Sequence, residues 1–201
     1  LTVQHAKLID GLKILELGVR KGISTSLFLK LCEENDGKLV SVDIADCGHL
    51  YKNKRWNFLH TRDDNFEKID KEILKMGGLD VIYIDSFHES SHVKKIFYHY
   101  YKLLSKNGFI FVDDICWLPY AKSSYRESSG MYDANYKVFE KLLEIKFNNR
   151  ENLNIDFSFN DSGTAKITKI TEAGIKEPKK IKKSFLFKNW FLNIYKIFIN
   201  K

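Results

Sequence analysis

Short apolar runs alternate with segments of helical period through most of the chain. Runs of apolar and β-branched residues predict buried strands at 13–17, 38–45, 56–61, 79–84 and 109–112. Between them, apolar residues recur every three or four positions, which predicts amphipathic helices at 22–35, 64–76 and 89–106. Gly77-Gly78 and Asn107-Gly108 are expected to end the second and third of these helices.

Residues 116–170 have a different pattern. After loop-like residues 116–130 and a predicted helix at 132–147, polar and apolar residues alternate over 154–159 and 164–170, separated by Asn160-Asp161-Ser162-Gly163. This is typical of an antiparallel hairpin. We therefore predict an α/β fold: a Rossmann-like, doubly wound, mostly parallel sheet of seven strands that ends in an antiparallel hairpin.

The distribution of charge divides the chain in two. Of 33 basic and 26 acidic residues, eight lysines and one acid (Glu177) lie in 176–201, which leaves 25 of each sign in 1–175. The whole net charge of +7 therefore belongs to the tail. A nucleic-acid enzyme carries its positive charge around its cleft, so we expect no nucleic-acid partner. We expect a single domain over 1–175 and a separate basic tail over 176–201.

The cysteines and the chain ends contain no export or metal signal. Cys32, Cys47 and Cys116 are far apart, with no metal-binding spacing, so reduced thiols and a cytoplasmic location are expected. The chain starts without Met and without a signal-peptide pattern, which suggests a truncated or processed start. No uninterrupted apolar run approaches the ~18 residues of a membrane span.

Polar residues follow the first two predicted strands, where ligands bind in sheets of this kind. Gly18 and Gly22 flank Arg20 in the turn after the first strand, and Asp43 ends the second strand, 21 residues after Gly22. An acid at this interval can accept hydrogen bonds from a ribose. Arg20 stands where a dinucleotide-binding turn has its middle glycine, which counts against a nicotinamide cofactor. A plain strand-to-helix turn is the alternative interpretation.

Three short sequence motifs and one aspartate, taken in order, resemble the motifs of class I S-adenosylmethionine-dependent methyltransferases. They are the E-x-G-x-x-x-G-x-S string at 16–24, Asp43, the string at 82–88 (IYIDSFH) and the string at 109–114 (FIFVDD). The last two resemble the branch of catechol, macrocin and caffeoyl-CoA type O-methyltransferases. The resemblance covers roughly 12–170 and implies S-adenosyl-L-methionine as cofactor.

The resemblance also implies roles for individual residues. Glu16, Gly18 and Gly22 would shape the methionine pocket, with Ser24 hydrogen-bonding nearby, and Asp43 would hold the ribose. Asp63 would lie near the adenine amino group, although the string at 60–64 (HTRDD) lacks the usual glycine and leaves the choice between Asp63 and Asp64 open. Asp85 would lie beside the bound cofactor.

Candidate catalytic residues follow the fourth and fifth strands. Asp85, Asp113 and Asp114 supply three carboxylates, which suit Mg²⁺ or another hard divalent cation, and the metal-dependent relatives have acids at matching places. His88 occupies the place of a lysine base in the catechol-type relatives and could act as the base with Asp85. The alternatives are a helix cap for Asp85, a turn for the aspartate pair and an ordinary helix-start residue for His88.

We therefore expect an O-methyltransferase acting on a hydroxyl of a small molecule or saccharide, assisted by a divalent metal. Aromatic residues and Arg126 in the 116–130 loop are candidates for an acceptor wall, or for an ordinary ordered loop. A nicotinamide-dependent oxidoreductase and a non-catalytic, membrane-recruited binding module are the competing hypotheses. A homo-oligomer is compatible with each of them.

The tail predicts a basic amphipathic helix. Lysines at 179–183 (KKIKK) precede 184–200, where Asn189, Asn193, Lys196 and Asn200 form a narrow polar stripe opposite aromatic and aliphatic residues. This pattern is typical of a helix that lies on an anionic membrane surface, as in a peripheral membrane protein. Packing of the helix on a partner protein or on the body of the chain is the alternative.

Overall fold

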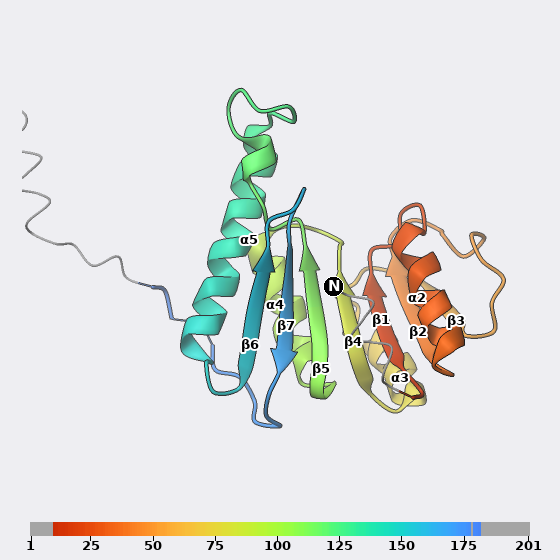
Figure 1. The fold of residues 1–201 in the computed structure, drawn as a ribbon. Coiled ribbons are helices and arrows are strands. Elements are labelled where there is room, and N and C mark those ends of the chain that lie inside the picture. The colour runs from red at the N-terminus through yellow and green to blue at the C-terminus, as the bar shows by residue number, and fades with distance from the viewer. Residues whose placement is uncertain (1–9, 178, 182–201) are drawn as a thin grey trace, which may run out of the picture.

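A seven-stranded sheet runs through the protein, as the computed structural model shows for residues 10–177 and 179–181. The strand order is β3-β2-β1-β4-β5-β7-β6 (Figure 1). The strands are β1 (Lys13–Leu17), β2 (Lys38–Asp43), β3 (Trp56–His60), β4 (Leu79–Ile84), β5 (Leu104–Asp113), β6 (Leu153–Ser158) and β7 (Thr164–Lys169). The first five are parallel, and β7 is antiparallel to both β5 and β6.

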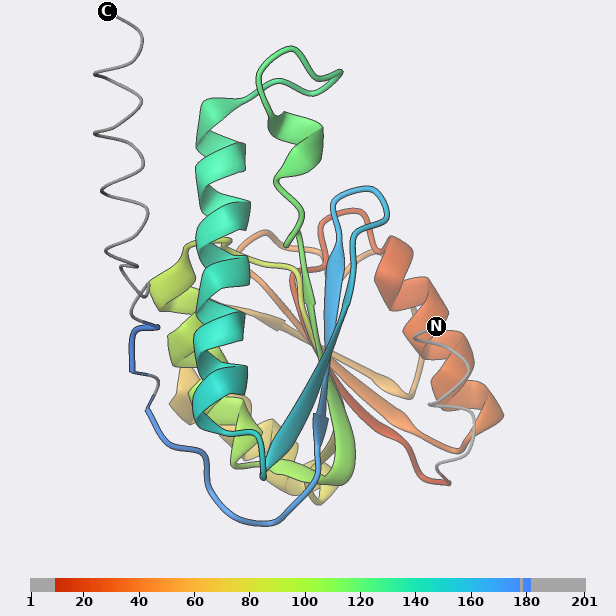
Figure 2. The same cartoon turned by 60° about the vertical axis from the view of Figure 1, so that its left-hand side comes forward.

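Helices cover both faces of the sheet unequally. Figures 1 and 2 show α2 (Ile23–Glu34) on one face and α4 (Ser90–Tyr101) and α5 (Ser129–Asn148) on the other. The larger hydrophobic cluster contains buried residues of α4, α5 and α3 (Phe66–Met76), whereas the smaller cluster contains those of α2. The fold class predicted from the sequence is confirmed, including the mostly parallel sheet and the closing antiparallel hairpin.

The boundary between α4 and β5 differs from the prediction. The helix ends at Tyr101, not at residue 106, and β5 begins at Leu104, five residues earlier than expected. Leu104 is buried and pairs with Leu79, and the register shifts before Phe109 pairs with Val81. Asn107 and Gly108 therefore belong to an irregular stretch of the strand and do not cap the helix.

The start of α5 also differs from the prediction. The helix begins at Ser129, three residues before the expected position, because the Ser128 side chain accepts a hydrogen bond from the N–H of Met131 and caps it. The preceding loop contains a short 3₁₀ helix, η1 (Leu118–Tyr120). In Figures 1 and 2, this loop and the first turns of α5 extend beyond the carboxyl edge of the sheet.

The topology places the candidate residues at one edge. Strands β1, β2, β4 and β5 are parallel, so the glycine turn, Asp43, Asp85 and the 113–114 pair all follow strands at the same edge. An antiparallel β7 between β5 and β6 distinguishes this sheet from the 3-2-1-4-5-6 order of dinucleotide-binding folds.

The basic tail is described only at its beginning. The N–H and carbonyl of Lys176 bond to Asn149 and Tyr98, and the carbonyl of Lys179 accepts a bond from Asn148, so this segment lies against α4 and α5. The predicted helix at 184–200 lies outside the described residues. Within the described ranges, none of the helices is long and apolar enough to cross a membrane.

Candidate functional site

A cavity of about 380 Å³ opens at the carboxyl edge of the sheet. This volume falls within the usual range for small-molecule sites. Its walls come from the turns after β1, β2, β3 and β4 and from the start of α4. The lining residues are Gly18, Arg20, Val42, Asp43, Ile44, Thr61, Arg62, Asp63, Asp85, Ser86, Phe87 and His92.

Close packing of two turns explains why a glycine follows β1. A methyl group built on Gly18 would lie 2.0 Å from the carbonyl oxygen of Asp85, and Gly18 has a φ of 98°. Any side chain here would push the turns after β1 and β4 apart. Gly22 precedes α2, and the Tyr51 hydroxyl donates a 2.8 Å hydrogen bond to its carbonyl. Gly18 therefore shapes the cavity wall through its backbone, whereas Gly22 does not line the cavity and is held at the start of α2.

Asp43 is tied to the glycine turn. One carboxylate oxygen accepts hydrogen bonds from the N–H groups of Val19 (2.8 Å) and Arg20 (2.9 Å), and the other accepts one from Ala45 (2.8 Å). Partial burial would raise the pKa of Asp43, but these backbone hydrogen bonds outweigh it and lower the pKa below its usual value. The cavity wall therefore carries an ionised carboxylate that still has acceptor capacity.

Glu16 supports the turn from inside the protein. It is fully buried, and its carboxylate accepts hydrogen bonds from the hydroxyls of Ser24 (2.6 Å), Thr25 (2.8 Å) and Ser41 (2.6 Å). Burial raises the pKa of Glu16, although the three hydroxyls oppose this effect. Glu16 and Ser24 do not line the cavity; they lock β1, α2 and β2 together behind it. Thr25 and Ser41 were not predicted as site residues, although a serine within the apolar run at 38–45 is a visible signal in the sequence.

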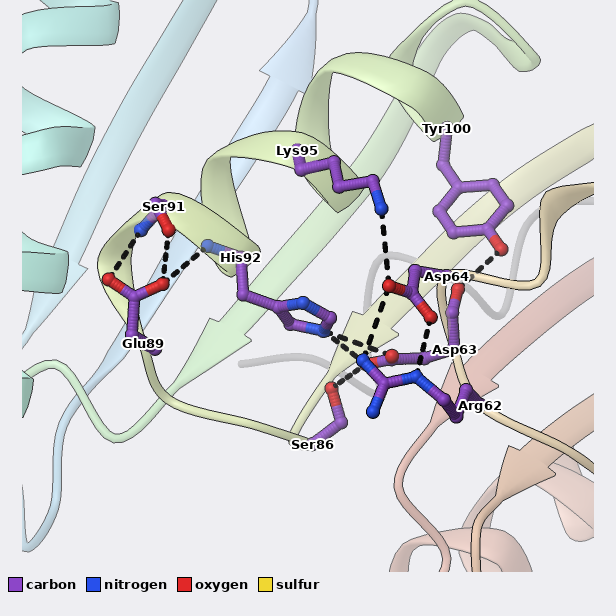
Figure 3. A network of polar contacts seen from close by, with 9 residues as sticks. All are labelled: Arg62, Asp63, Asp64, Ser86, Glu89, Ser91, His92, Lys95 and Tyr100. Atoms are coloured by element: carbon purple, nitrogen blue, oxygen red, sulfur yellow. Dashed lines mark hydrogen bonds and ion pairs between the residues drawn. The ribbon is translucent and has the colours of Figure 1, made fainter.

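Asp63 lines the cavity and Asp64 does not. The Asp63 carboxylate accepts hydrogen bonds from the Ser86 hydroxyl (2.5 Å) and from Nε2 of His92 (2.9 Å), as Figure 3 shows. Asp64 pairs instead with Arg62 (2.9 Å) and Lys95 (3.1 Å). Of these two acids, Asp63 is therefore the one placed to contact a ligand.

Asp85, His88 and Asp114 form a convergent group. One ligand atom from each lies within 4.8 Å of the others, and Nε2 of His88 is 3.5 Å from Asp85 and 3.3 Å from Asp114. Burial would lower the pKa of His88, but the neighbouring carboxylates outweigh it and raise the pKa above its usual value. Asp114 has a φ of 55°, a strained conformation of the kind that clusters at functional sites.

Asp113 is not part of this convergent group. Its carboxylate accepts hydrogen bonds from the hydroxyls of Tyr83 (3.0 Å) and Thr164 (2.8 Å), which ties together the ends of β4, β5 and β7. Burial raises the pKa of Asp113, and the charges of Asp85 and Asp114 act in the same direction. Asp85 does not cap α4, because Glu89 occupies the capping position.

The loop after Asp114 combines anchors with exposed aromatic side chains. Trp117 packs against Tyr136, Phe139 and Phe159, so it anchors the loop to α5 and the terminal hairpin. Tyr125 is exposed, and its neighbour Arg126 pairs with Asp161 of the hairpin turn. The exposed part of the loop is the part available to an acceptor.

Comparisons with known proteins agree on the fold. The family described as "Methyltransferase domain" matches residues 15–115. Three solved structures resemble this one at low identity. The first is the MycE methyltransferase of the mycinamycin pathway, solved with Mg, SAH and mycinamycin VI: TM-score 0.57, 16% identity, covering 84% of this chain and 47% of that one.

The second is a Staphylococcus aureus protein provisionally described as a caffeoyl-CoA O-methyltransferase (TM-score 0.62, 18% identity, 84% and 79% covered). The third is a Clostridium thermocellum protein provisionally described as an rRNA methylase (TM-score 0.62, 16% identity, 84% and 95% covered). The chain spans about half the length of MycE. No curated protein matches it by sequence. At these identities the likeness establishes the fold, and the molecules named in the descriptions of the three proteins differ.

Proposed function

The chain belongs to the methyltransferase-domain family, and from this premise we propose that it is an S-adenosylmethionine-dependent O-methyltransferase for a small hydroxylated acceptor. The observation that carries the proposal is the juxtaposition of two groups at one edge of the sheet. A cavity walled by Asp43 and Asp63 meets, at Asp85, the cluster of Asp85, His88 and Asp114. The first group suits a nucleoside and the second suits the activation of a hydroxyl.

The cavity fits the methyl donor in size and chemistry. Asp43 would accept hydrogen bonds from ribose hydroxyls, and Asp63 would accept one from the adenine amino group. The glycine turn would let the amino-acid part approach the backbone of Gly18 closely, with Glu16 and Ser24 bracing the turn from behind. When bound, the donor supplies a methyl group already activated on a sulfonium.

The chain's own task is to position and deprotonate the acceptor. We assign the base to Nε2 of His88, because it converges with Asp85 and Asp114 at the edge of the cavity, where an acceptor hydroxyl would lie. The carboxylates of Asp85 and Asp114 would hold a divalent cation, and such a cation would lower the pKa of the acceptor hydroxyl. Asp113, held by Tyr83 and Thr164, would keep these strand ends in place.

A small acceptor fits better than a nucleic acid. Residues 1–175 are formally neutral, and a nucleic-acid enzyme needs positive charge around its cleft. A saccharide is a suitable acceptor, because the loop after Asp114 carries the exposed aromatic side chain of Tyr125. The solved complex of MycE with mycinamycin VI supports a small-molecule acceptor.

Titration calorimetry with S-adenosylhomocysteine, the product of the donor, tests the proposal. We expect a dissociation constant of order 1–100 µM and about tenfold weaker binding by Asp43→Asn, which loses a charged acceptor. NADH should not bind. Absence of binding by S-adenosylhomocysteine to the folded protein would contradict the proposal.

A second titration, with Mn²⁺ or Mg²⁺, separates the roles in the convergent group. We expect Asp85→Asn and Asp114→Asn to weaken cation binding strongly. His88→Asn should retain both cation and S-adenosylhomocysteine binding but lose at least about a hundredfold in methyl transfer. Loss of cation binding in His88→Asn would make His88 a ligand and contradict its assignment as the base.

We propose further that the tail, 176–201, brings the enzyme to an anionic membrane surface as a peripheral, cytoplasmic protein. The lysine cluster at 179–183 and the wide aromatic side of 184–200 are the sequence features that support this role. A lipid-linked saccharide would place the acceptor and the docking surface together.

A further inference from the structure

A histidine holds the cavity-facing carboxylate of Asp63. Both side chains are about nine-tenths buried, and both line the cavity. Nε2 of His92 lies 2.9 Å from one carboxylate oxygen and 3.0 Å from the other. An ionised carboxylate can only accept, so Nε2 carries the hydrogen and donates it.

The remaining contacts leave Asp63 little freedom. The Ser86 hydroxyl donates to the same carboxylate, and the Tyr100 hydroxyl donates a 3.0 Å bond to the main-chain carbonyl of Asp63 (Figure 3). His92 is itself fixed, because it stands in the first turn of α4 and Glu89 accepts its N–H. A carboxylate has about four acceptor positions, so Asp63 retains capacity toward the cavity in one defined direction.

The same pair recurs seven residues later, away from the cavity. Nε2 of His99 lies 2.9 Å and 3.0 Å from the two carboxylate oxygens of Asp70, and His99 stacks on Phe66. Neither His99 nor Asp70 lines the cavity. The chain therefore contains a contact of the same geometry between α3 and α4 whose role is limited to joining them.

We propose that His92 is a positioning residue that aims Asp63 at the amino group of the purine and thereby selects adenine over a 6-oxo purine. This inference rests on the proposed function, which places the adenine moiety in this cavity. An aimed carboxylate accepts a hydrogen bond from the 6-amino group. A carbonyl at the same place would turn its partially negative oxygen toward the carboxylate and offer it no hydrogen, which sites of this kind reject strongly.

The experiment compares two ligands on four proteins by titration calorimetry. The ligands are S-adenosylhomocysteine and S-inosylhomocysteine, which carries a carbonyl in place of the 6-amino group. The proteins are the unchanged chain, His92→Phe, His92→Gln and the matched control His99→Phe. Phenylalanine keeps a ring against Phe87 but has no N–H to donate, whereas glutamine restores a donor.

We expect the unchanged chain and His99→Phe to prefer the adenine ligand by roughly 10- to 100-fold, the worth of a hydrogen bond to a charged group. In His92→Phe the preference should fall below about threefold, and His92→Gln should recover part of it. Thermal unfolding of each variant checks that it is folded. If His92→Phe does not fold, the test uses the preference for adenine in His92→Gln and in Ser86→Ala. The Ser86→Ala substitution removes the other donor to Asp63.

The outcomes separate the two proposals. If S-adenosylhomocysteine does not bind the unchanged chain, the proposed function fails. If it binds but the preference for adenine is absent, or is the same in the His92 and His99 variants, His92 has only a structural role and the inference is overturned while the proposed function stands. Where His92→Phe is unfolded, an unaltered preference in both His92→Gln and Ser86→Ala overturns the inference.

Discussion

Single residues at the carboxyl edge fix how closely the turns approach. Gly18 is the clearest case. A methyl group added to it would lie 2.0 Å from the Asp85 carbonyl oxygen, and the substituted residue would have to keep a φ of 98°. Gly77, which ends α3 with a φ of 82°, has no atom within 4 Å of the added methyl group. Substitution of Gly18 therefore adds a steric overlap to an unfavourable φ, whereas substitution of Gly77 changes only the cost of its φ.

We expect Gly18→Ala to lower the free energy of unfolding by about 3 kcal/mol or more and to abolish S-adenosylhomocysteine binding. Gly77→Ala should cost about 1 kcal/mol and leave binding intact. Urea unfolding followed by circular dichroism, with calorimetry for binding, measures both. Equal losses in the two variants would show that the approach of Gly18 to Asp85 is unimportant.

The ion pairs of Asp64 make the stability of the protein depend on pH in the acid range. The hydrogen bond from Arg62 holds the pKa of Asp64 well below its usual value against partial desolvation, and Lys95 adds to this effect. A carboxylate whose pKa is depressed in the folded state contributes stability above its unfolded pKa of about 3.9, and this contribution disappears as the pH falls through the folded pKa.

We therefore expect Asp64→Asn to be less stable than the unchanged chain at pH 7, with a difference that begins to narrow below about pH 4. Because Arg62 and Lys95 are largely exposed, the difference should be small and should shrink with added salt. Unfolding curves between pH 2 and 7 measure it. A difference that is constant across this range would contradict the assignment.

At the scale of elements, a buried lysine sets the end of α4. Nζ of Lys169, on β7, donates hydrogen bonds to the carbonyls of Leu104 (2.6 Å) and Tyr101 (3.5 Å) and lies over the Tyr101 ring. A cation at a helix C-terminus satisfies carbonyls that the helix itself leaves unpaired. The helix ends there although its sequence pattern continues to residue 106.

Lys169→Met should therefore lower the free energy of unfolding by about 1–3 kcal/mol, because buried carbonyls lose their donor. Lys71→Met removes an exposed lysine paired with Glu67 on α3 and should leave the unfolding midpoint unchanged. Urea unfolding of both variants tests this. A similar, small effect in the two variants would mean that water replaces the amine.

For the whole molecule, we propose that residues 10–175 carry the catalytic site and that the tail, 176–201, serves for docking. Both hydrophobic clusters lie within 12–175. A chain ended at residue 181 should therefore keep its unfolding midpoint and its affinity for S-adenosylhomocysteine. The full chain should sediment with phosphatidylserine vesicles, less so at high salt, and the shortened chain should not.

Phosphatidylcholine vesicles, which carry no net charge, are the control. Neither the full chain nor the shortened chain should sediment with them to a large extent. If the full chain does not sediment with anionic vesicles but is a dimer that the shortening converts to a monomer, the tail packs on a partner subunit and the membrane proposal is wrong. Size-exclusion chromatography with light scattering measures this outcome.

The order of strands and helices along the chain could be predicted from the sequence, because alternation of apolar runs and helical periods is a local property of the chain. The sequence also indicated Gly18, Asp43 and Asp85 as edge residues, since each directly follows an apolar run. Element ends such as Tyr101 were missed because they depend on Lys169, which is distant in sequence.

The contacts between polar residues could not be predicted from the sequence in the same way, because they depend on how the elements pack. Burial and hydrogen-bond geometry place Asp63 and not Asp64 at the cavity, separate His92 from His88, and exclude Asp113 from the group formed by Asp85, His88 and Asp114. The side chains in each of these choices are adjacent or within a few residues in the sequence. Their directions are set by the long-range packing of strands and helices, which no local pattern encodes.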